Sequence, residues 1–179
     1  MTTFTPDRYV TALRFAAVRH AGQRVPDSEL PYLVHLTSVA AEVIAALGAT
    51  RVADPDLAVQ CALLHDCIED TPTTRAEVVA AFGEPVAAGV HALTKDAALS
   101  KAEGMTDSLR RIRTQPREVW MVKLADRITN LAPPPSSWTP DKCARYRDEA
   151  ITIADALGEA CAALDARLRA RIAAYAAYT

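Results

Sequence analysis

The sequence lacks the features of a secreted, membrane-spanning or nucleic-acid-binding protein. Its four cysteines form no C-x-x-C pair and are too sparse for a small disulfide-built domain, so we expect buried thiols in a reducing compartment. The N-terminus has no basic segment followed by an apolar one, and no apolar run approaches the roughly 18 residues that span a bilayer. Lys and Arg number 20 against 22 Asp and Glu, which gives no electrostatic reason to expect nucleic acid or a membrane as partner. These absences favour a soluble cytoplasmic protein.

The hydrophobic residues that are present follow helical spacing. Half of the 179 residues are hydrophobic, enough for one sizeable core and few for two. No segment alternates as a half-buried strand does, and no internal repeat is found. We therefore expect an all-α fold in a single domain, residues 1–179, with loops at residues 22–31 and 96–104. The expected helices cover residues 6–21, 32–47, 54–71, 74–82, 84–94, 105–114, 116–131, 139–157 and 159–178.

The stretch ALLHDCIEDT, residues 62–71, places several polar side chains on an apolar helix. With about 3.6 residues per turn, His65 shares a face with Glu69, and Asp66 shares one with Asp70, while leucine and isoleucine can bury the rest. A buried carboxylate is costly unless it is paired or binds a cation. The stretch therefore indicates a metal site, although a helix end with solvated acidic residues has the same pattern.

Four polar residues on three predicted helices are candidate metal ligands: His35, His65, Asp66 and Asp126. Imidazole together with carboxylate suits Mn, Fe, Co or Zn, and two of each leave coordination positions for water and substrate. Each residue also has a structural interpretation when it is taken singly. His35, for example, could be a core histidine.

The pattern H…HD…D resembles the signature of the HD superfamily of metal-dependent phosphohydrolases. Five segments make the resemblance closer: HAGQR, PYLVH, ALLHDCIEDT, LTK and KLADRITN, at residues 20–24, 31–35, 62–71, 93–95 and 123–130. These segments are similar to the hydrolase domain of RelA/SpoT homologues and to stand-alone small alarmone hydrolases, which remove the 3′-pyrophosphate of (p)ppGpp with Mn²⁺. The resemblance extends to the C-terminal part of the chain, where Trp138 and Tyr146 match aromatic residues of the small hydrolases.

The resemblance implies an HD-domain bundle of about eight to ten helices, with Mn²⁺ or another divalent ion held by His35, His65, Asp66 and Asp126. Glu69 and Asp70 match the catalytic acidic pair of the family, which positions and deprotonates a water, although Asp70 could instead support a ligand. The positions that match or approximate substrate-binding residues are Arg24, Lys95, Asn130, Lys142 and Tyr146. We interpret Lys123 and Arg127 as structural residues whose positive charges offset Asp126 or interact with a helix C-terminus. We interpret His20 and His91 as structural histidines.

The chain departs from its relatives on the side of the nucleotide base. Val25 replaces a lysine, and the segment LAPPP, residues 131–135, replaces a segment with Arg and Thr that contacts the nucleotide. The resemblance therefore implies (p)ppGpp as the substrate, with (p)ppApp or another 3′-phosphorylated nucleotide as the alternative. A non-catalytic HD regulatory module, or an antitoxin-like partner of an alarmone synthetase, is the alternative of another class. The base preference, the metal bound and any homo-oligomer stay open.

Overall fold

Helices joined by loops build the described chain, which comprises residues 4–179 of this computed structural model. In this range there are ten α-helices, two 3-10 helices and no β-strand beyond an isolated bridge between Arg24 and Pro31, which confirms the all-α prediction. None of these helices is long and apolar enough to cross a membrane. The helices are α1 (Pro6–Arg19), α2 (Leu33–Leu47), α3 (Pro55–Leu64), α4 (Cys67–Asp70), α5 (Arg75–Phe82), α6 (Glu84–Leu93), α7 (Lys101–Arg113), α8 (Arg117–Asn130), α9 (Pro140–Leu157), η1 (Gly158–Ala160), α10 (Ala162–Tyr175) and η2 (Ala176–Tyr178).

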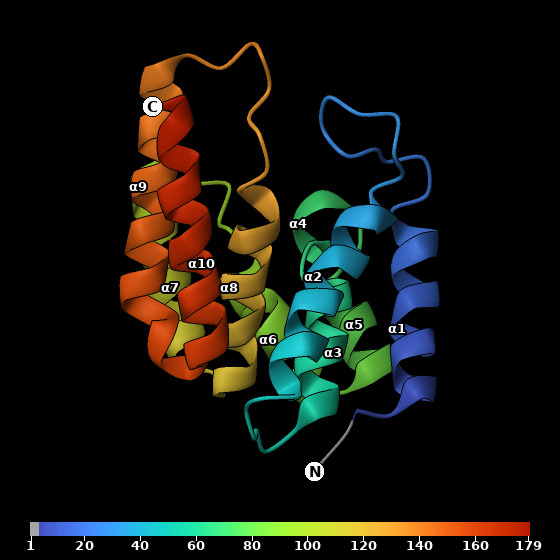
Figure 1. The fold of residues 1–179 in the computed structure, drawn as a ribbon. Helices are drawn as coiled ribbons and strands as arrows, with labels where there is room; N and C mark the ends of the chain where they lie inside the picture. The colour runs from blue at the N-terminus through green and yellow to red at the C-terminus, as the bar shows by residue number, and fades with distance from the viewer. Residues whose placement is uncertain (1–3) are drawn as a thin grey trace.

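Three helices, α2, α3 and α8, pack against one another in the middle of the bundle. Figure 1 shows α1 beyond α3 on one side and α9 with α10 on the other. Two loops, residues 20–32 and 131–139, project from the same end of the bundle, next to α4 (Figure 1). Side chains of the two loops can therefore lie close to side chains at the adjoining helix ends.

Side-chain caps explain where several of the helices begin. Thr74 and Glu77 form the predicted capping box at the start of α5. Ser100 and Glu103 form a second box at the start of α7, so that helix begins at Lys101 and not near Met105. The loop predicted over residues 96–104 is therefore shorter than expected, because the capping box stabilises an N-terminal turn that has no apolar stripe.

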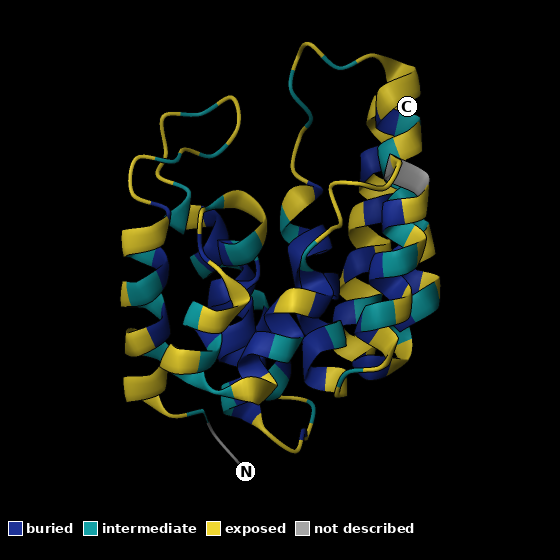
Figure 2. Cartoon of the chain, turned by 180° about the vertical axis from the view of Figure 1, so that it is seen from behind, coloured by how far each residue is buried: buried dark blue, intermediate teal, exposed yellow. Residues whose placement is uncertain are grey.

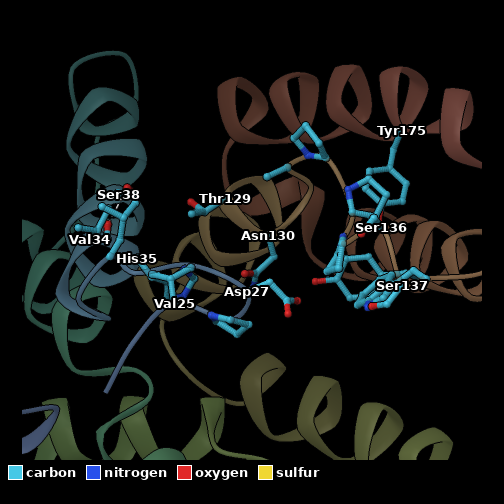
Figure 3. A pocket seen from close by; sticks show the side chains of 18 residues that line it. Val25, Asp27, Val34, His35, Ser38, Thr129, Asn130, Ser136, Ser137 and Tyr175 are labelled. Carbon is cyan, nitrogen blue, oxygen red and sulfur yellow. Dashed lines mark hydrogen bonds between the residues drawn. The ribbon is translucent and has the colours of Figure 1, made fainter. Parts of the chain in front are cut away.

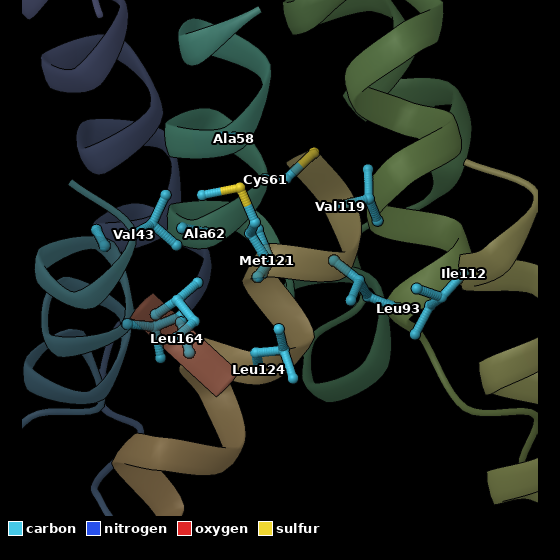
Figure 4. Packing of buried hydrophobic residues seen from close by; sticks show 14 of the residues in the cluster. Val43, Ala58, Cys61, Ala62, Leu93, Ile112, Val119, Met121, Leu124 and Leu164 are labelled. Atoms are coloured by element: carbon cyan, nitrogen blue, oxygen red, sulfur yellow. The ribbon is translucent and has the colours of Figure 1, made fainter. Parts of the chain in front are cut away.

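The buried hydrophobic residues form one cluster between the helices. Met121 and Leu124 of α8 are fully buried and lie among side chains of α2, α3 and α10 (Figure 4). Figure 2 shows that the buried residues follow the inward faces of the helices, while exposed residues cover the outside. This core fixes α2, α3 and α8 relative to one another, and these helices carry or adjoin all four candidate metal ligands.

A buried carboxylate also ties α8 to the start of α3. Glu118 is only 2% exposed, and its Oε1 accepts hydrogen bonds from the backbone N–H groups of Ala53, at 2.8 Å, and Asp54, at 2.9 Å. Asp54 in turn caps α3 by accepting from the backbone N–H of Leu57. These contacts set the position of α3, whose far end carries the His65-Asp66 pair.

We predict that Gly89→Ala destabilises the fold. A Cβ at this position of α6 would lie 2.7 Å from Sγ of Cys61 on α3 and 2.9 Å from Cγ2 of Val119 on α8. Such overpacking costs about 1–3 kcal/mol of unfolding free energy. Gly104→Ala in α7 is the matched control, because a Cβ there meets nothing within 4 Å. Denaturant titration should show the loss for Gly89→Ala alone, and equal stability of both variants would contradict this account of the packing.

Candidate metal centre and active site

The helix predicted over residues 54–71 is interrupted at its HD dipeptide. α3 ends at Leu64 and α4 begins at Cys67, and Asp66 has φ −97° and ψ −1°, away from the values of a regular helix. On an uninterrupted helix the side chains of His65 and Asp66 would project about 100° apart. In the structure His65 Nε2 lies 3.0 Å from Asp66 Oδ2. The prediction of one continuous helix was wrong, and the break directs both side chains to one point.

His35 from α2 and Asp126 from α8 complete a buried cluster around this point. His35 Nε2 lies 3.3 Å from His65 Nε2, 3.6 Å from Asp66 Oδ2 and 3.5 Å from Asp126 Oδ1. The ligand atoms of His35, His65 and Asp126 all lie within 4.8 Å of one another, and all three residues are buried. The structure thus brings together the four predicted ligands from three separate parts of the chain.

The geometry of this cluster fits a divalent metal ion. Ligand atoms that share one ion at about 2.1 Å lie about 3.0–3.4 Å apart, close to the separations found here. His65 Nδ1 donates to the backbone carbonyl of Ala62 at 2.8 Å, which turns Nε2 toward the cluster. The hydroxyl of Tyr32 donates to Asp66 Oδ2 at 2.5 Å, so this carboxylate is also oriented by a neighbour. The residues could therefore hold a metal ion with both imidazoles and both carboxylates.

Two carboxylates, the buried Asp126 and the half-buried Asp66, give the cluster a strong preference for positive charge. Burial works to lower the pKa of His65, but Asp66 and then Asp126 outweigh it and raise this pKa to about 9. Burial also works to raise the pKa of Asp66, but the neighbouring His65 and hydrogen bonds from His35 and Tyr32 hold it well below its usual range. A proton on His65 thus takes the place of a cation.

Asp126 is held from two sides by residues of its own helix. Lys123 Nζ donates to Asp126 Oδ2 at 2.9 Å, and Asn130 Nδ2 donates to Asp126 Oδ1 at 2.5 Å. Lys123 is buried and forms an ion pair with Asp126, which confirms the predicted pairing of the two charges. Burial acts to raise the pKa of Asp126, but Lys123 and His65 lower it overall, which keeps the carboxylate ionised and available to a cation.

The acidic pair Glu69-Asp70 lies on α4, directly after the break. Glu69 accepts two hydrogen bonds from Lys95: Oε2 from the backbone N–H at 2.8 Å and Oε1 from Nζ at 2.9 Å. Asp70 Oδ2 accepts a hydrogen bond of 3.1 Å from Nε2 of Gln23. The two acids therefore have different surroundings, because Glu69 is neutralised by a cation and Asp70 is held by a neutral amide.

Arg111 of α7 holds the end of α6 in place beside this pair. Its guanidinium donates to the backbone carbonyls of His91, Ala92 and Thr94 at 2.6–3.0 Å. These carbonyls lie at the C-terminus of a helix, where intrahelical partners are missing and a cation is favoured. Because Lys95 follows Thr94 directly, this contact also fixes the residue that binds Glu69.

Two adjoining cavities meet at Asn130. The smaller, of about 220 Å³, is strongly polar, and its lining residues are Tyr32, His65, Asp66, Glu69, Asp70, Leu93, Lys95, Lys123, Asp126 and Asn130. The larger, of about 730 Å³, lies between the two projecting loops and includes His35, Asn130, Trp138 and Tyr146 in its wall. Figure 3 shows Val25 and Asp27 on one side of it and Ser136, Ser137 and Tyr175 on the other.

Three of the five predicted substrate-binding residues line these cavities, namely Lys95, Asn130 and Tyr146. Arg24 lies elsewhere, since its Nη1 contacts Glu29 Oε2 at 2.8 Å and it lines a separate cavity of about 250 Å³. Lys142 places its Nζ 4.0 Å from the centre of the Trp138 ring, in a cation–π contact. The roles of Arg24 and Lys142 in substrate binding stay predictions.

Tyr32 and Gln23 reach the candidate site but were missed from the sequence. The sequence places Tyr32 only at the start of a helix, although it precedes His35 by three residues and so lies on the same helical face. The sequence places Gln23 in a loop, where no periodicity predicts what a side chain contacts. The only sequence signal for either residue is its place inside the segments HAGQR and PYLVH.

Fold and site together define an all-helical protein with a His/Asp centre of the kind that metal-dependent hydrolases use. The model of the HD domain matches residues 12–163, and the chain belongs to the HD-domain family. The family predicted from the sequence segments is thereby confirmed.

Relatives named as hydrolases cover most of the chain. It is 33% identical over 162 residues to guanosine-3′,5′-bis(diphosphate) 3′-pyrophosphohydrolase MESH1 of Danio rerio, covering 88% of each protein. It is 33% identical over 161 residues to the bifunctional (p)ppGpp synthase/hydrolase SpoT of Escherichia coli, covering 84% of this chain and 22% of that protein. A solved structure described as a metazoan ortholog of SpoT that hydrolyzes ppGpp superimposes with a TM-score of 0.81 and 27% identity, covering 95% of this chain and 96% of that one.

We predict that metal binding displaces a proton from His65. With a pKa of about 9, the metal-free imidazole is protonated at neutral pH, whereas a metal ion needs the neutral ring. The affinity for Mn²⁺ should therefore rise with pH and level off above the pKa, with about one proton released per ion near neutral pH. Calorimetric titration in two buffers of different ionisation enthalpy counts the protons. An affinity that is flat or falls as the pH rises would contradict the prediction.

Proposed function

We propose that this chain hydrolyses guanosine-3′,5′-bis(diphosphate) at its 3′-pyrophosphate, with Mn²⁺ as the metal ion. The observation that carries the proposal is the polar cavity in which the His/Asp cluster and the pair Glu69-Asp70 face the same space. The names of its relatives support the reaction and the substrate. An intact acidic pair beside the cluster argues against a module that only binds nucleotides.

The two cavities suit the two parts of such a substrate. The larger has room for a nucleoside and offers the aromatic rings of Trp138, Tyr146 and Tyr175. The smaller is lined by His65, Asp66 and Asp126 of the cluster and by Lys95, whose amino group suits a diphosphate. Asn130 lines both, so we assign to it the contact at the junction between ribose and 3′-phosphate.

His35, His65, Asp66 and Asp126 would hold the metal ion. Mixed imidazole and carboxylate ligands favour Mn²⁺ over Mg²⁺ or Ca²⁺, which prefer oxygen ligands alone. When bound, the ion supplies Lewis-acid stabilisation of negative charge on the phosphoryl group and makes water more acidic. Lys123 and Asn130 keep Asp126 turned toward the ion, and Tyr32 does the same for Asp66.

We assign the general base to Asp70 and a positioning role to Glu69. Both oxygens of Glu69 already accept hydrogen bonds from Lys95, so we assign this carboxylate to fixing Lys95 at the edge of the cavity. Among the described residues, the carboxylate of Asp70 accepts a hydrogen bond from the neutral amide of Gln23 and no cation pairs with it, so its other oxygen is open to a water. Both acids line the polar cavity.

In the proposed reaction a water oxygen forms a bond to the phosphorus next to the 3′-oxygen. The bond between that phosphorus and the 3′-oxygen breaks, which releases pyrophosphate, and the 3′-oxygen takes a proton from solvent water to become a hydroxyl. The proton lost by the water goes to Asp70. Lys95 offsets charge on the departing pyrophosphate, in agreement with its place in the wall of the cavity.

A panel of nucleotides tests the proposed activity. We expect purified protein with Mn²⁺ to release pyrophosphate from ppGpp and to lose this activity on chelation. The panel includes ppApp, because Val25 and the prolines of residues 133–135, where the chain departs from its relatives, line the cavity assigned to the nucleoside. Faster turnover of ppApp than of ppGpp would identify the adenine nucleotide as the substrate. No turnover of either nucleotide would overturn the proposal.

Asp70→Asn tests the assignment of the base. The variant keeps the size of the side chain and removes its basicity, so kcat should fall by about 10²–10⁴-fold. Mn²⁺ affinity should not change, because Asp70 is not among the four candidate ligands. Asp148→Asn, at an exposed position of α9, is the matched control and should retain full activity. A kcat for Asp70→Asn within a factor of a few of the wild type would assign the base elsewhere.

A further inference from the structure

A line of hydrogen bonds runs from the core to Asp70. Cys67 Sγ lies 3.6 Å from His20 Nε2, His20 Nδ1 lies 2.6 Å from Gln23 Oε1, and Gln23 Nε2 lies 3.1 Å from Asp70 Oδ2. His20 is 5% exposed and is the residue that follows α1. The sequence interpretation of His20 as merely structural does not account for this line.

The chemistry of the groups fixes the direction of the two bonds that join His20 to Gln23 and Gln23 to Asp70. An ionised carboxylate only accepts, so Gln23 must present its NH₂ group to Asp70 and its carbonyl oxygen to His20. That oxygen also only accepts, so Nδ1 of His20 carries the proton that it donates. The other ring nitrogen, Nε2, faces Sγ of Cys67. The donors of His20 and Gln23 therefore both point toward Asp70, and a flipped Gln23 amide would place two acceptors against each other.

Local backbone geometry brings His20 and Gln23 together. α1 ends at Arg19, and Gly22 has φ +84°, a left-handed conformation that glycine adopts at little cost. The backbone N–H of Gln23 then donates to the carbonyl of His20 at 3.0 Å. This turn explains why the two residues are separated by three positions in the segment HAGQR.

His20 also supports the metal side of the site. Its ring stacks on Tyr32 with the centroids 5.1 Å apart and the planes at 25°. Tyr32 in turn donates its hydroxyl to Asp66, a candidate ligand. One buried ring therefore contacts both the residue that orients Asp66 and the residue that orients Asp70.

Asp70 needs such support because of its position. It is the last residue of a four-residue helix and is exposed, so its own backbone restricts its side chain little. Among the hydrogen bonds of the described residues, the one from Gln23 is the one that reaches its carboxylate. A general base must lie within hydrogen-bond reach of the water that it deprotonates, and a misplacement of about 1 Å can cost 10²-fold in rate.

We infer that His20 and Gln23 are positioning residues for the hydrolysis: His20 sets the orientation of the Gln23 amide, and Gln23 holds the Asp70 carboxylate toward the polar cavity. The inference rests on the proposed function, since it assigns the two residues to the base of that reaction. Neither residue touches the reacting atoms in this account.

A double-mutant cycle tests the inference. Gln23→Met preserves the length of the side chain and removes its donor, so kcat should fall about tenfold, the equivalent of one hydrogen bond to a charged group. KM and Mn²⁺ affinity should stay unchanged. In a protein that already carries Asp70→Asn, the same change should cost nothing further, because Gln23 acts through Asp70. Gln115→Met, at a half-buried glutamine between α7 and α8, is the matched control and should leave kcat unchanged in both backgrounds.

Three results would overturn the inference. An equal loss of kcat from Gln23→Met with and without Asp70→Asn would mean that Gln23 does not act through Asp70. If Gln23→Met fails to fold, Gln23→Glu replaces it, since it keeps the acceptor for His20 and loses the donor, and wild-type activity of Gln23→Glu would exclude the role. A wild type that turns over no nucleotide would overturn the proposed function together with the inference, whereas an active wild type with additive losses overturns the inference alone.

Discussion

The candidate site depends on the interruption of one helix between α3 and α4. A regular helix separates neighbouring side chains, but the break at His65 and Asp66 turns both toward one point, 3.0 Å apart. Every residue of α3 from Leu57 to Leu64 is buried, and His65 and Cys67 at the break are buried as well. His35 and Asp126 then reach the same point because α2 and α8 pack against α3.

Two carboxylates at this point, the buried Asp126 and the half-buried Asp66, require positive charge nearby. Lys123 supplies one fixed charge to Asp126, and a proton on His65 supplies another in the absence of a metal ion. A divalent cation satisfies the same requirement and binds all four side chains at once. The acidic residues that follow the break are held differently, Glu69 by Lys95 and Asp70 by Gln23, and this difference separates their chemical roles. One short segment thus carries half of the candidate metal centre and both candidate catalytic acids.

The sequence predicts what depends on local pattern. Helical spacing predicts the all-α fold, and polar residues within apolar helices identify His35, His65, Asp66 and Asp126, because a buried charge needs a partner. The break in the helix could not be predicted, since residues 62–71 contain neither Gly nor Pro and fit a continuous helix. The contacts of Tyr32 with Asp66 and of Gln23 with Asp70 also could not be predicted, because the partners are 34 and 47 positions apart in the sequence. The position of Arg24 was not predictable for the same reason. This loop residue pairs with Glu29 and lines a cavity separate from the candidate site.

The central claim is that the broken helix holds one divalent ion together with α2 and α8. Anomalous diffraction at the manganese edge, from crystals grown with Mn²⁺, tests this claim most directly. The account predicts a single strong peak within bonding distance of His35, His65, Asp66 and Asp126. A peak that excludes either residue of the His65-Asp66 pair, or no peak in this cluster at saturating Mn²⁺, would contradict it.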